Sequence, residues 1–371
     1  TKIKALLPKH RFSIDREVEQ DFPHLPPGCA IQLDRLSRRH VLENIRENLK
    51  KLALQVPERL RSFSHETGQP LTFGNFIQHH DYEPERLLVR ETWSTWKAKA
   101  SLTEFPSDPD IKRLKNALIR LAFTNGPTEI ARLQKIIRLL KTRQVDQAIS
   151  VAGNTAIMIH YRIWAEKGNI LGMHSLQESF DRLSKNPTIL ADMEEILAWA
   201  ESETPVAGRK PELPFACPLE LHAQYGFKDI LAALGQATFE TAGQRGVGII
   251  HLPDVKAYGI IITFQKTEKE FSPSTMYADF PISRDLLHWE SQSTTRQNTN
   301  TGQNLIQHKL RGYTILIFAR SHKKQNNCTV PFTYLGPAVC QNYQGERPIQ
   351  MIWKLGHPMP VEMFEDNRKG G

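Results

Sequence analysis

Apolar side chains recur every three or four positions from residue 37 to about residue 200, which is the spacing of helices that bury one face. The pattern predicts helices at 37 to 55, 57 to 63, 72 to 79, 83 to 89, 108 to 126, 127 to beyond 140, 145 to 166 and 175 to 200. Trp93 and Trp96 lie three residues apart, so we expect both indoles to pack in a helical core. The first part of the chain is therefore predicted to be all-helical.

The pattern changes between residues 201 and 218, where four prolines interrupt a segment without periodicity, as in a linker. One more helix is predicted from 227 to 234. Short β-branched and aromatic runs follow, and they predict strands at 247 to 252, 258 to 264, 306 to 308, 314 to 320, 332 to 338 and 348 to 355. The spacing favours a small, strongly bent sheet or partly open barrel, so the predicted fold class is α+β.

One stretch, Phe271 to His308, has little apolar periodicity and mixes aromatic, amide, hydroxyl and basic side chains. This mixture suits a site that holds a flat polar ring beside a polyanion. A long solvated loop whose aromatic residues cap the core would show the same composition, and at this stage both interpretations stay open.

Composition narrows the class of protein. The 371 residues favour two domains, and a net charge of +8 suits a polyanionic partner. No apolar run reaches the length of a membrane span. The four cysteines, Cys29, Cys217, Cys328 and Cys340, are far apart, which argues against a structural zinc site and predicts a cytoplasmic protein.

Motifs for catalysis are incomplete. The sequence has no GxxxxGK[ST] loop for a nucleotide-driven motor. His322 and Lys324 have the HxK spacing of a phospholipase-D-like nuclease, but Thr329 stands where that motif needs an aspartate. His288 and Glu290 would share one face of a strand, yet no third metal ligand follows with a clear spacing. We therefore expect no catalytic residue, no metal and no cofactor in this chain, and binding is favoured over catalysis.

Several blocks stand in a characteristic order between residues 213 and 360: GIIHLPDVKAYGIIITF, FSPSTMYADFPISRDLLHWESQSTT, TGQNLIQH, ILIFARSHKK, FTYLGPAVC and RPIQMIWKL. They resemble a family of C-terminal domains catalogued as a domain of unknown function. That family ends bacterial superfamily-two (DEAD/DEAH-type) helicases, often behind a phospholipase-D-like nuclease. SauUSI-type type IV restriction enzymes have this layout and cut DNA that carries modified cytosine. LPPGCAIQLDRLSRRHVLENIRENL similarly resembles the segment that follows the helicase motor.

The resemblance implies a helical coupling domain at 1–205 and an SRA/PUA-like β-barrel at 206–371 that flips a modified base of DNA into a pocket. Helicase motor and nuclease domains, in the same or a partner chain, would be its partners. A flipped base needs stacking faces, edge readers and phosphate clamps. Stacking is assigned to Tyr277 and Trp289 with Phe271 in support, edge reading to Asp279 and Gln292, and phosphate contacts to Lys266, Lys269, Arg284 and Arg296.

Two alternatives from other classes remain. In the first, the chain is an interaction module that docks the motor to the nuclease or forms a homodimer. Such a module would bind duplexes weakly and without regard to modification. A stand-alone nuclease would instead cut DNA with a divalent metal. For Trp289 and Tyr277, simple core packing is as good an interpretation as base stacking.

Overall fold

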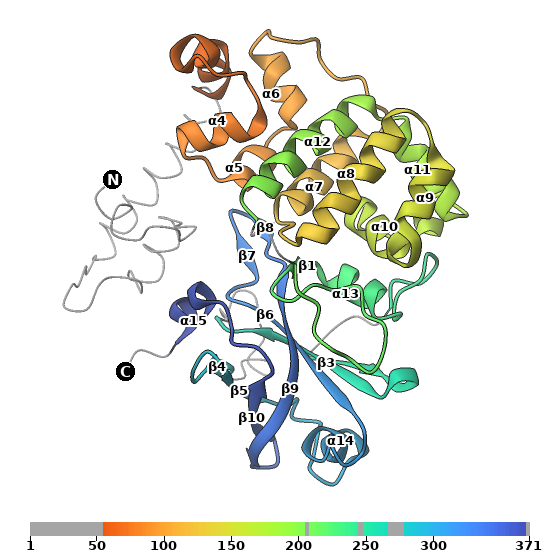
Figure 1. Cartoon of the computed structure of the whole chain (residues 1–371), viewed down its shortest axis with the longest axis vertical. Coiled ribbons are helices and arrows are strands. Elements are labelled where there is room, and N and C mark those ends of the chain that lie inside the picture. Colours follow the sequence, from red (N-terminus) through yellow and green to blue (C-terminus); the bar gives the residue numbers. More distant parts are fainter. Residues whose placement is uncertain (1–54, 205–207, 244–247, 266–277, 369–371) are drawn as a thin grey trace, which may run out of the picture. The chain divides into compact units, whose positions relative to one another are not determined.

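A computed structural model describes residues 55–204, 208–243, 248–265 and 278–368 (Figure 1). The chain divides into two compact units, Thr1–Ser107 and Asp108–Gly371. The predicted helix from 37 to 55 lies almost wholly outside the described residues. None of the described helices is both long and apolar enough to cross a membrane.

The described part of the first unit is helical. It consists of a helix that includes residues 55–67, then α4 (Phe73–His80), α5 (Pro84–Leu88) and α6 (Trp93–Lys99). The Thr92 hydroxyl accepts a hydrogen bond from the Thr95 N–H and so begins α6. Trp93 is fully buried and Trp96 nearly so, which confirms the predicted core role of both indoles.

The second unit begins with six α-helices among its described residues: α7 (Ile111–Ala122), α8 (Pro127–Lys141), α9 (Val145–Ala152), α10 (Ala156–Trp164), α11 (Leu176–Ser184) and α12 (Pro187–Ser202). Two predictions were too long. The predicted helix 145–166 is broken at Gly153, whose φ of +51° is not helical. The predicted helix 175–200 ends before Pro187, which starts a new helix at its first position.

The described residues then form one mixed sheet of eight strands: β1 (Gln224–Tyr225), β2 (Ile249–Leu252), β3 (Ala257–Thr263), β4 (Phe280–Pro281), β5 (Leu286–Glu290), β6 (Thr314–Arg320), β9 (Phe332–Gln344) and β10 (Gln350–Leu355). The strand order is β2-β3-β6-β9-β10-β5-β4, and β1 pairs with β9. Strands β3 and β6 are parallel, and the other pairs in this sheet are antiparallel. A separate short hairpin consists of β7 (Lys324–Gln325) and β8 (Cys328–Thr329).

The α+β class is confirmed, but the expected barrel is not. Strands β2 and β4 end the strand order and do not pair with each other among the described residues, so the sheet is not closed. The predicted strand at 306–308 is also wrong. These residues end α14 (Asn300–Ile306) and start the turn after it, because the Thr299 hydroxyl accepts from the Gly302 N–H and caps a helix there.

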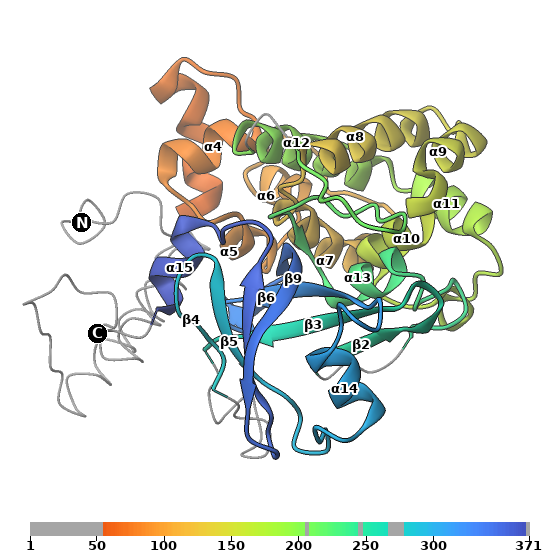
Figure 2. The ribbon, with the colours of Figure 1, turned by 60° about the horizontal axis from the view of Figure 1, so that its bottom comes forward.

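Two apolar cores pack against the sheet, one on each face. One core joins β3, β6, β9 and β10 to β5 and to Leu305 of α14. The other joins the opposite face of β2, β6 and β9 to α10 and to α13 (Phe227–Ala233), a helix that confirms its prediction. Figure 2 shows α10 and α13 on one side of β3 and α14 on the other. The second unit ends in α15 (Val361–Asn367).

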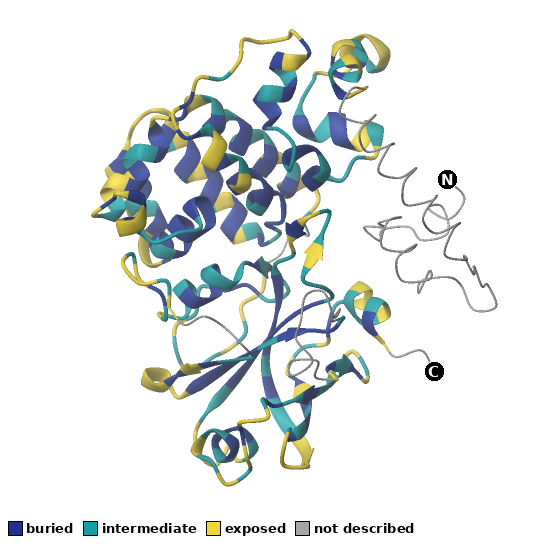
Figure 3. Cartoon of the chain, turned by 180° about the vertical axis from the view of Figure 1, so that it is seen from behind, coloured by how far each residue is buried: buried dark blue, intermediate teal, exposed yellow. Residues whose placement is uncertain are grey.

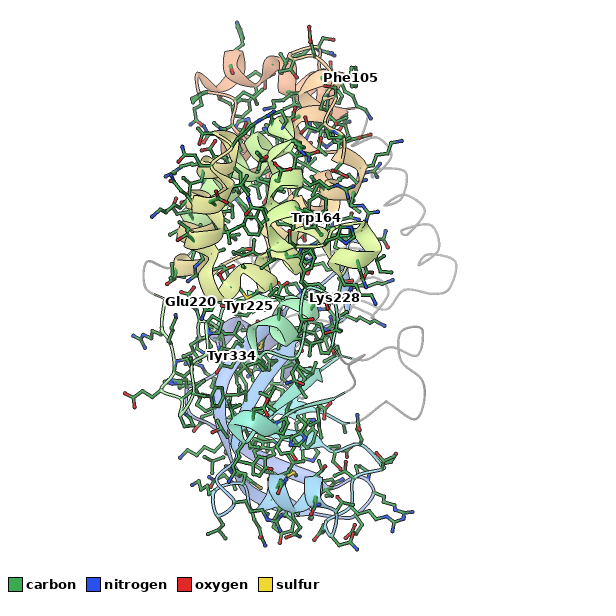
Figure 4. All side chains as sticks on the ribbon, turned by 90° about the vertical axis from the view of Figure 1, so that its right-hand side faces the viewer. Phe105, Trp164, Glu220, Tyr225, Lys228 and Tyr334 are labelled. Atoms are coloured by element: carbon green, nitrogen blue, oxygen red, sulfur yellow. The ribbon has the colours of Figure 1, made fainter. Side chains whose placement is uncertain are left out.

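A buried ionic group also joins the helices to the sheet side of this unit. Arg162 of α10 is 2% exposed, and its Nη2 lies 2.9 Å from Oδ2 of Asp229 in α13. The Glu220 carboxylate accepts from the Thr128 and Glu129 N–H groups at the start of α8, at 3.2 and 3.0 Å. Figure 4 labels Glu220 and Tyr225 where the helices meet the strands. The predicted boundary between residues 205 and 206 therefore falls inside one compact unit.

Candidate nucleic-acid interface

Strands β9, β10, β5 and β4 carry one face that is less buried than the other. Along β10, Gln350, Ile352 and Lys354 alternate with fully or almost fully buried Met351, Trp353 and Leu355. Along β5, the half-buried residues are Leu286, His288 and Glu290. Successive side chains of a strand point to opposite faces, so these residues share one side of the sheet. We call it the polar face; its members are Phe280, Leu286, His288, Glu290, Asn342, Gln344, Gln350, Ile352 and Lys354.

A row of hydrogen bonds crosses three strands on the polar face. The Gln344 Nε2 donates to Gln350 Oε1 at 2.8 Å, and Gln350 Nε2 donates to Glu290 Oε1 at 3.2 Å. The other carboxylate oxygen of Glu290 accepts from the Ala278 N–H at 2.9 Å. Strand register explains the row, because Gln350 lies opposite both Gln344 and Glu290.

An aromatic pair lies beside this row. The rings of Phe280 and His288 are stacked, with centroids 4.6 Å apart and planes 15° apart. They face each other because the two residues are paired in register between β4 and β5. His288 Nδ1 lies 2.7 Å from the Ala278 carbonyl oxygen, which can only accept, so Nδ1 carries the proton. The same backbone residue thus orients both the imidazole and the Glu290 carboxylate.

The polar face combines two kinds of recognition. Each glutamine amide has two N–H groups and an oxygen that accepts two bonds, so each side chain keeps capacity beyond the row. A carboxylate can accept from the exocyclic amino group of cytosine. A half-buried aromatic pair next to these groups offers a surface on which a flat ring can stack. The face can therefore bind a planar ring that carries donors and acceptors on its edge.

Asp279 and Trp289, two of the predicted pocket residues, lie behind this face. Asp279 is 7% exposed, and its Oδ1 accepts from the Glu290 N–H at 3.0 Å, so it holds the chain before β4 against β5. Trp289 is 2% exposed and packs in the core, 6.3 Å between ring centroids from Trp353. This geometry favours core packing for Trp289. Its stacking role and the edge-reading role of Asp279 stay predictions.

Three of the other predicted site residues lie within the described ranges. Gln292 is half-buried just after β5. Arg284 is exposed, although its Nε donates to the Met359 carbonyl at 2.9 Å, and Arg296 is exposed before α14. The remaining predicted residues lie outside the described residues: Phe271, Tyr277, Lys266 and Lys269. Among the predicted residues that the structure describes, Asp279 and Trp289 lie close to Glu290.

Sequence reasoning missed Gln344 and Gln350. Both belong to the segment QNYQGERPIQ, whose glutamines end one strand and begin the next. The exposed tip of this hairpin, residues 341–347, is visible in Figure 3. His288 and Glu290 do share a face, as expected for two residues two apart on a strand. No group of three or more possible metal ligands gathers anywhere in the described ranges.

Comparisons with known proteins find a similarity over part of the chain. Residues 219–366 match a family model described as "Domain of unknown function (DUF3427)". No curated protein matches the chain. Among solved structures, a crystal structure of Arabidopsis thaliana SUVH6 in complex with SAM is similar at 13% identity and a TM-score of 0.28. The similarity covers 64% of this chain and 41% of the SUVH6 chain, and a TM-score this low does not show a shared fold.

Proposed function

We propose that this chain is the DNA-binding C-terminal region of an ATP-dependent, modification-dependent restriction helicase–nuclease, and that it recognises modified cytosine by base flipping. The observation that carries the proposal is the row Gln344–Gln350–Glu290 beside the stacked Phe280–His288 pair. The row and the pair lie within residues 219–366, the segment that matches the family model.

Recognition by base flipping involves a single base. Inside a duplex, the Watson–Crick edge of cytosine is occupied, so a protein that reads it must first extrude the base. The extruded ring then needs a stacking partner, which Phe280 and His288 offer, and an acceptor for its amino group, which Glu290 offers. Glutamine amides beside that carboxylate can donate to the carbonyl oxygen and ring nitrogen of the same edge.

The charge balance supports a nucleic-acid partner. The chain carries 48 Lys and Arg residues against 40 Asp and Glu residues. Contacts with phosphates position a protein on DNA, whereas contacts with base edges give specificity. Under this proposal the cations bind the phosphate backbone and the polar face reads the base. The chain itself supplies no ATP hydrolysis and no cutting; partner domains supply both.

Equilibrium binding of the whole chain to matched duplexes tests the function. Fluorescence anisotropy would be measured with labelled duplexes that differ only in one cytosine, either 5-methylated, 5-hydroxymethylated or unmodified. We expect tighter binding to at least one modified duplex, and a loss of affinity for all three as salt is raised. Equal and weak binding to all three would favour the interaction module, which docks other protein domains and has no use for a modified base.

A further inference from the structure

A second surface lies at one end of the parallel strands β3 and β6. Ala257 pairs with Thr314 in register, and the Thr314 N–H donates to the Lys256 carbonyl at 2.9 Å. The turn that precedes β3 (253–256) and the loop that precedes β6 (307–313) therefore lie side by side. We call the second segment the Leu310 loop.

Three aromatic rings stack beneath this end of the sheet. His251 lies over Tyr258 with ring centroids 4.6 Å apart and planes 14° apart. Tyr258 in turn stacks on Tyr313, at 5.2 Å and 28°. Tyr258 is 2% exposed, whereas His251 is exposed and Tyr313 half-buried. The base of the Leu310 loop thus rests on a rigid aromatic platform.

Hydrogen bonds hold the Leu310 loop to that platform. Asn304 Nδ2 donates to the Tyr258 hydroxyl at 3.0 Å, and Arg311 Nη1 donates to Asn304 Oδ1 at 2.9 Å. The Tyr313 N–H donates to the His308 carbonyl at 2.7 Å, which closes the loop. Gly312 has a φ of +71°, a conformation that suits glycine and turns the chain sharply. The loop is therefore preorganised for binding.

The tip of the loop is apolar and its flanks are cationic. Leu310 is 88% exposed, the highest value among the exposed large apolar side chains of the described residues. Lys309 and Arg311 flank it and are exposed, and Lys256 is exposed in the adjacent turn. Asp254 is a carboxylate in that turn, but no ion pair joins it or these three cations within the described parts of the chain.

We propose that the Leu310 loop contacts duplex DNA, with Leu310 inserted between base pairs and Lys256, Lys309 and Arg311 bound to the flanking phosphates. This inference rests on the proposed function, that the chain binds DNA. Apolar side chains of this kind enter the base stack in proteins that kink or open a duplex, and nearby cations offset the charge of the phosphates. Insertion of Leu310 separates neighbouring base pairs, which lets the recognised base leave the duplex.

A duplex explains the surface better than a protein partner does. A stable protein interface buries roughly 1,600 Å², with an apolar centre of several side chains. Here one fully projecting leucine stands among three cations, with Val255 of the adjacent turn only 38% exposed. Duplex DNA is a polyanion, and the gap between two adjacent base pairs is narrow and apolar. It therefore matches the three cations in charge and the single leucine in shape.

The test uses the whole chain and a duplex that carries 2-aminopurine, whose fluorescence rises when it loses its stacking partner. Wild-type protein should bind and raise the fluorescence. Leu310→Ala should bind more weakly and lose most of the rise, whereas Leu310→Met should keep it. Leu102→Ala is the matched control, because Leu102 is an exposed leucine, 43% accessible, in the other compact unit. The side chain of Leu310 is exposed, so its removal should leave the unfolding midpoint unchanged.

The outcomes separate this inference from the proposed function. If Leu310→Ala binds the duplex and raises the fluorescence as the wild type does, the insertion is wrong and the DNA-binding function stands. A wild-type chain that binds without any fluorescence change also overturns the insertion. If the wild-type chain binds no duplex at low salt, both proposals fail. The inference would likewise be overturned if the wild-type chain used Leu310 to bind phosphatidylserine vesicles and not to bind DNA.

Discussion

The side-chain amide of Gln350 donates a hydrogen bond to the carboxylate of Glu290, with 3.2 Å between the nitrogen and the oxygen. The two residues are 60 positions apart in the chain and directly opposite each other in the sheet. The carboxylate is oriented from a second side by the Ala278 N–H. A donor-rich row that ends on an oriented carboxylate is well suited to the edge of a planar ring, and the proposed function depends on it.

Replacing Trp289 with alanine should lower the free energy of unfolding. We expect this loss of stability rather than a direct effect on DNA binding. The indole is 2% exposed in the core between β5 and β10, and a buried tryptophan removed from a core costs roughly 3–5 kcal/mol. Urea unfolding followed by circular dichroism measures the loss. Trp289→Phe should retain most of the stability. A folded Trp289→Ala variant with unchanged stability but weaker binding of modified DNA, by roughly 1–3 kcal/mol, would instead restore the base-stacking role.

The salt dependence of binding should identify the cations that touch phosphates. Log affinity falls linearly with log salt, with a slope of about −0.9 for each phosphate contacted. Simultaneous replacement of Lys266 and Lys269 by alanine should reduce the slope by roughly one to two. The same experiment on Lys309 and Arg311 measures the contribution of the Leu310 loop. A slope unaltered by either double substitution would place the phosphate contacts elsewhere, as on the basic helices α7 and α8.

Folding stability should fall as the pH drops from 6.5 toward 4, in part because of His160. Burial lowers the pKa of His160 to about 4 from its usual 6.5. Its Nε2 donates to the Glu166 carbonyl and its Nδ1 accepts from the Ser179 hydroxyl, so the folded state holds the neutral ring. Above pH 6.5 the ring is neutral in both states and the stability is fully present. Between 6.5 and 4 only the unfolded chain takes up the proton, which costs roughly 3 kcal/mol in total.

Urea unfolding at a series of pH values, for the wild type and for His160→Gln, measures this contribution. Burial also lowers the pKa of His222 and of His308, so these two groups reduce the stability in the same direction. The difference between the two proteins isolates His160. A difference that stays constant from pH 7 to pH 4 would show that His160 is not held neutral.

The buried Arg162 should be far more important for stability than an exposed cation. Its side chain and that of Asp229 are 2% and 5% exposed, and Glu129 lies on its other side at 3.5 Å. Arg162→Met would leave the buried Asp229 carboxylate without its cation and Glu129 with Arg132 alone, which costs roughly 3–5 kcal/mol. Lys185→Met is the control, since the exposed Lys185–Asp181 pair should contribute about 1 kcal/mol or less. Similar losses in the two variants would show that the buried group is not held together by charge.

Local patterns predicted the helices and the longer strands, because burial of one face leaves a periodic trace in the sequence. Strand β6 and helix α13 came out close to their predicted bounds for this reason. The breaks at Gly153 and Pro187 and the helix α14 were missed, although Thr299 supplied a capping signal. β-branched and apolar residues near Ile306 resemble a short strand when that cap is ignored.

The polar face itself could not be derived in the same way. Glu290 was noted in the sequence, but its partner Gln350 is brought to it by the pairing of β10 with β5, and no local pattern fixes which strands pair. The stacking of Phe280 on His288 likewise depends on the register of β4. Trp289, in contrast, alternates with His288 and Glu290, and this alternation was the available signal that its indole faces the core.

Whether the polar face reads the edge of cytosine can be measured by comparing 5-methylcytosine with thymine at one position of an otherwise matched duplex. Both bases carry the same methyl group, but cytosine presents an amino donor where thymine presents a carbonyl acceptor. The quantity measured is the ratio of the two dissociation constants for wild type, Glu290→Gln and Glu362→Gln. Glu362 is an exposed carboxylate on α15, so its variant has the same change of charge away from the polar face.

The wild type and Glu362→Gln should prefer 5-methylcytosine by the same ratio. Glu290→Gln should lose about tenfold of that preference or more, because an edge contact is worth roughly 1–3 kcal/mol of discrimination and an amide can also donate to thymine. Every protein is measured with the same two duplexes. Any difference between the duplexes themselves therefore affects all the ratios equally and cancels in the comparison. A folded Glu290→Gln variant that keeps the wild-type ratio would contradict the claim that the polar face reads the base.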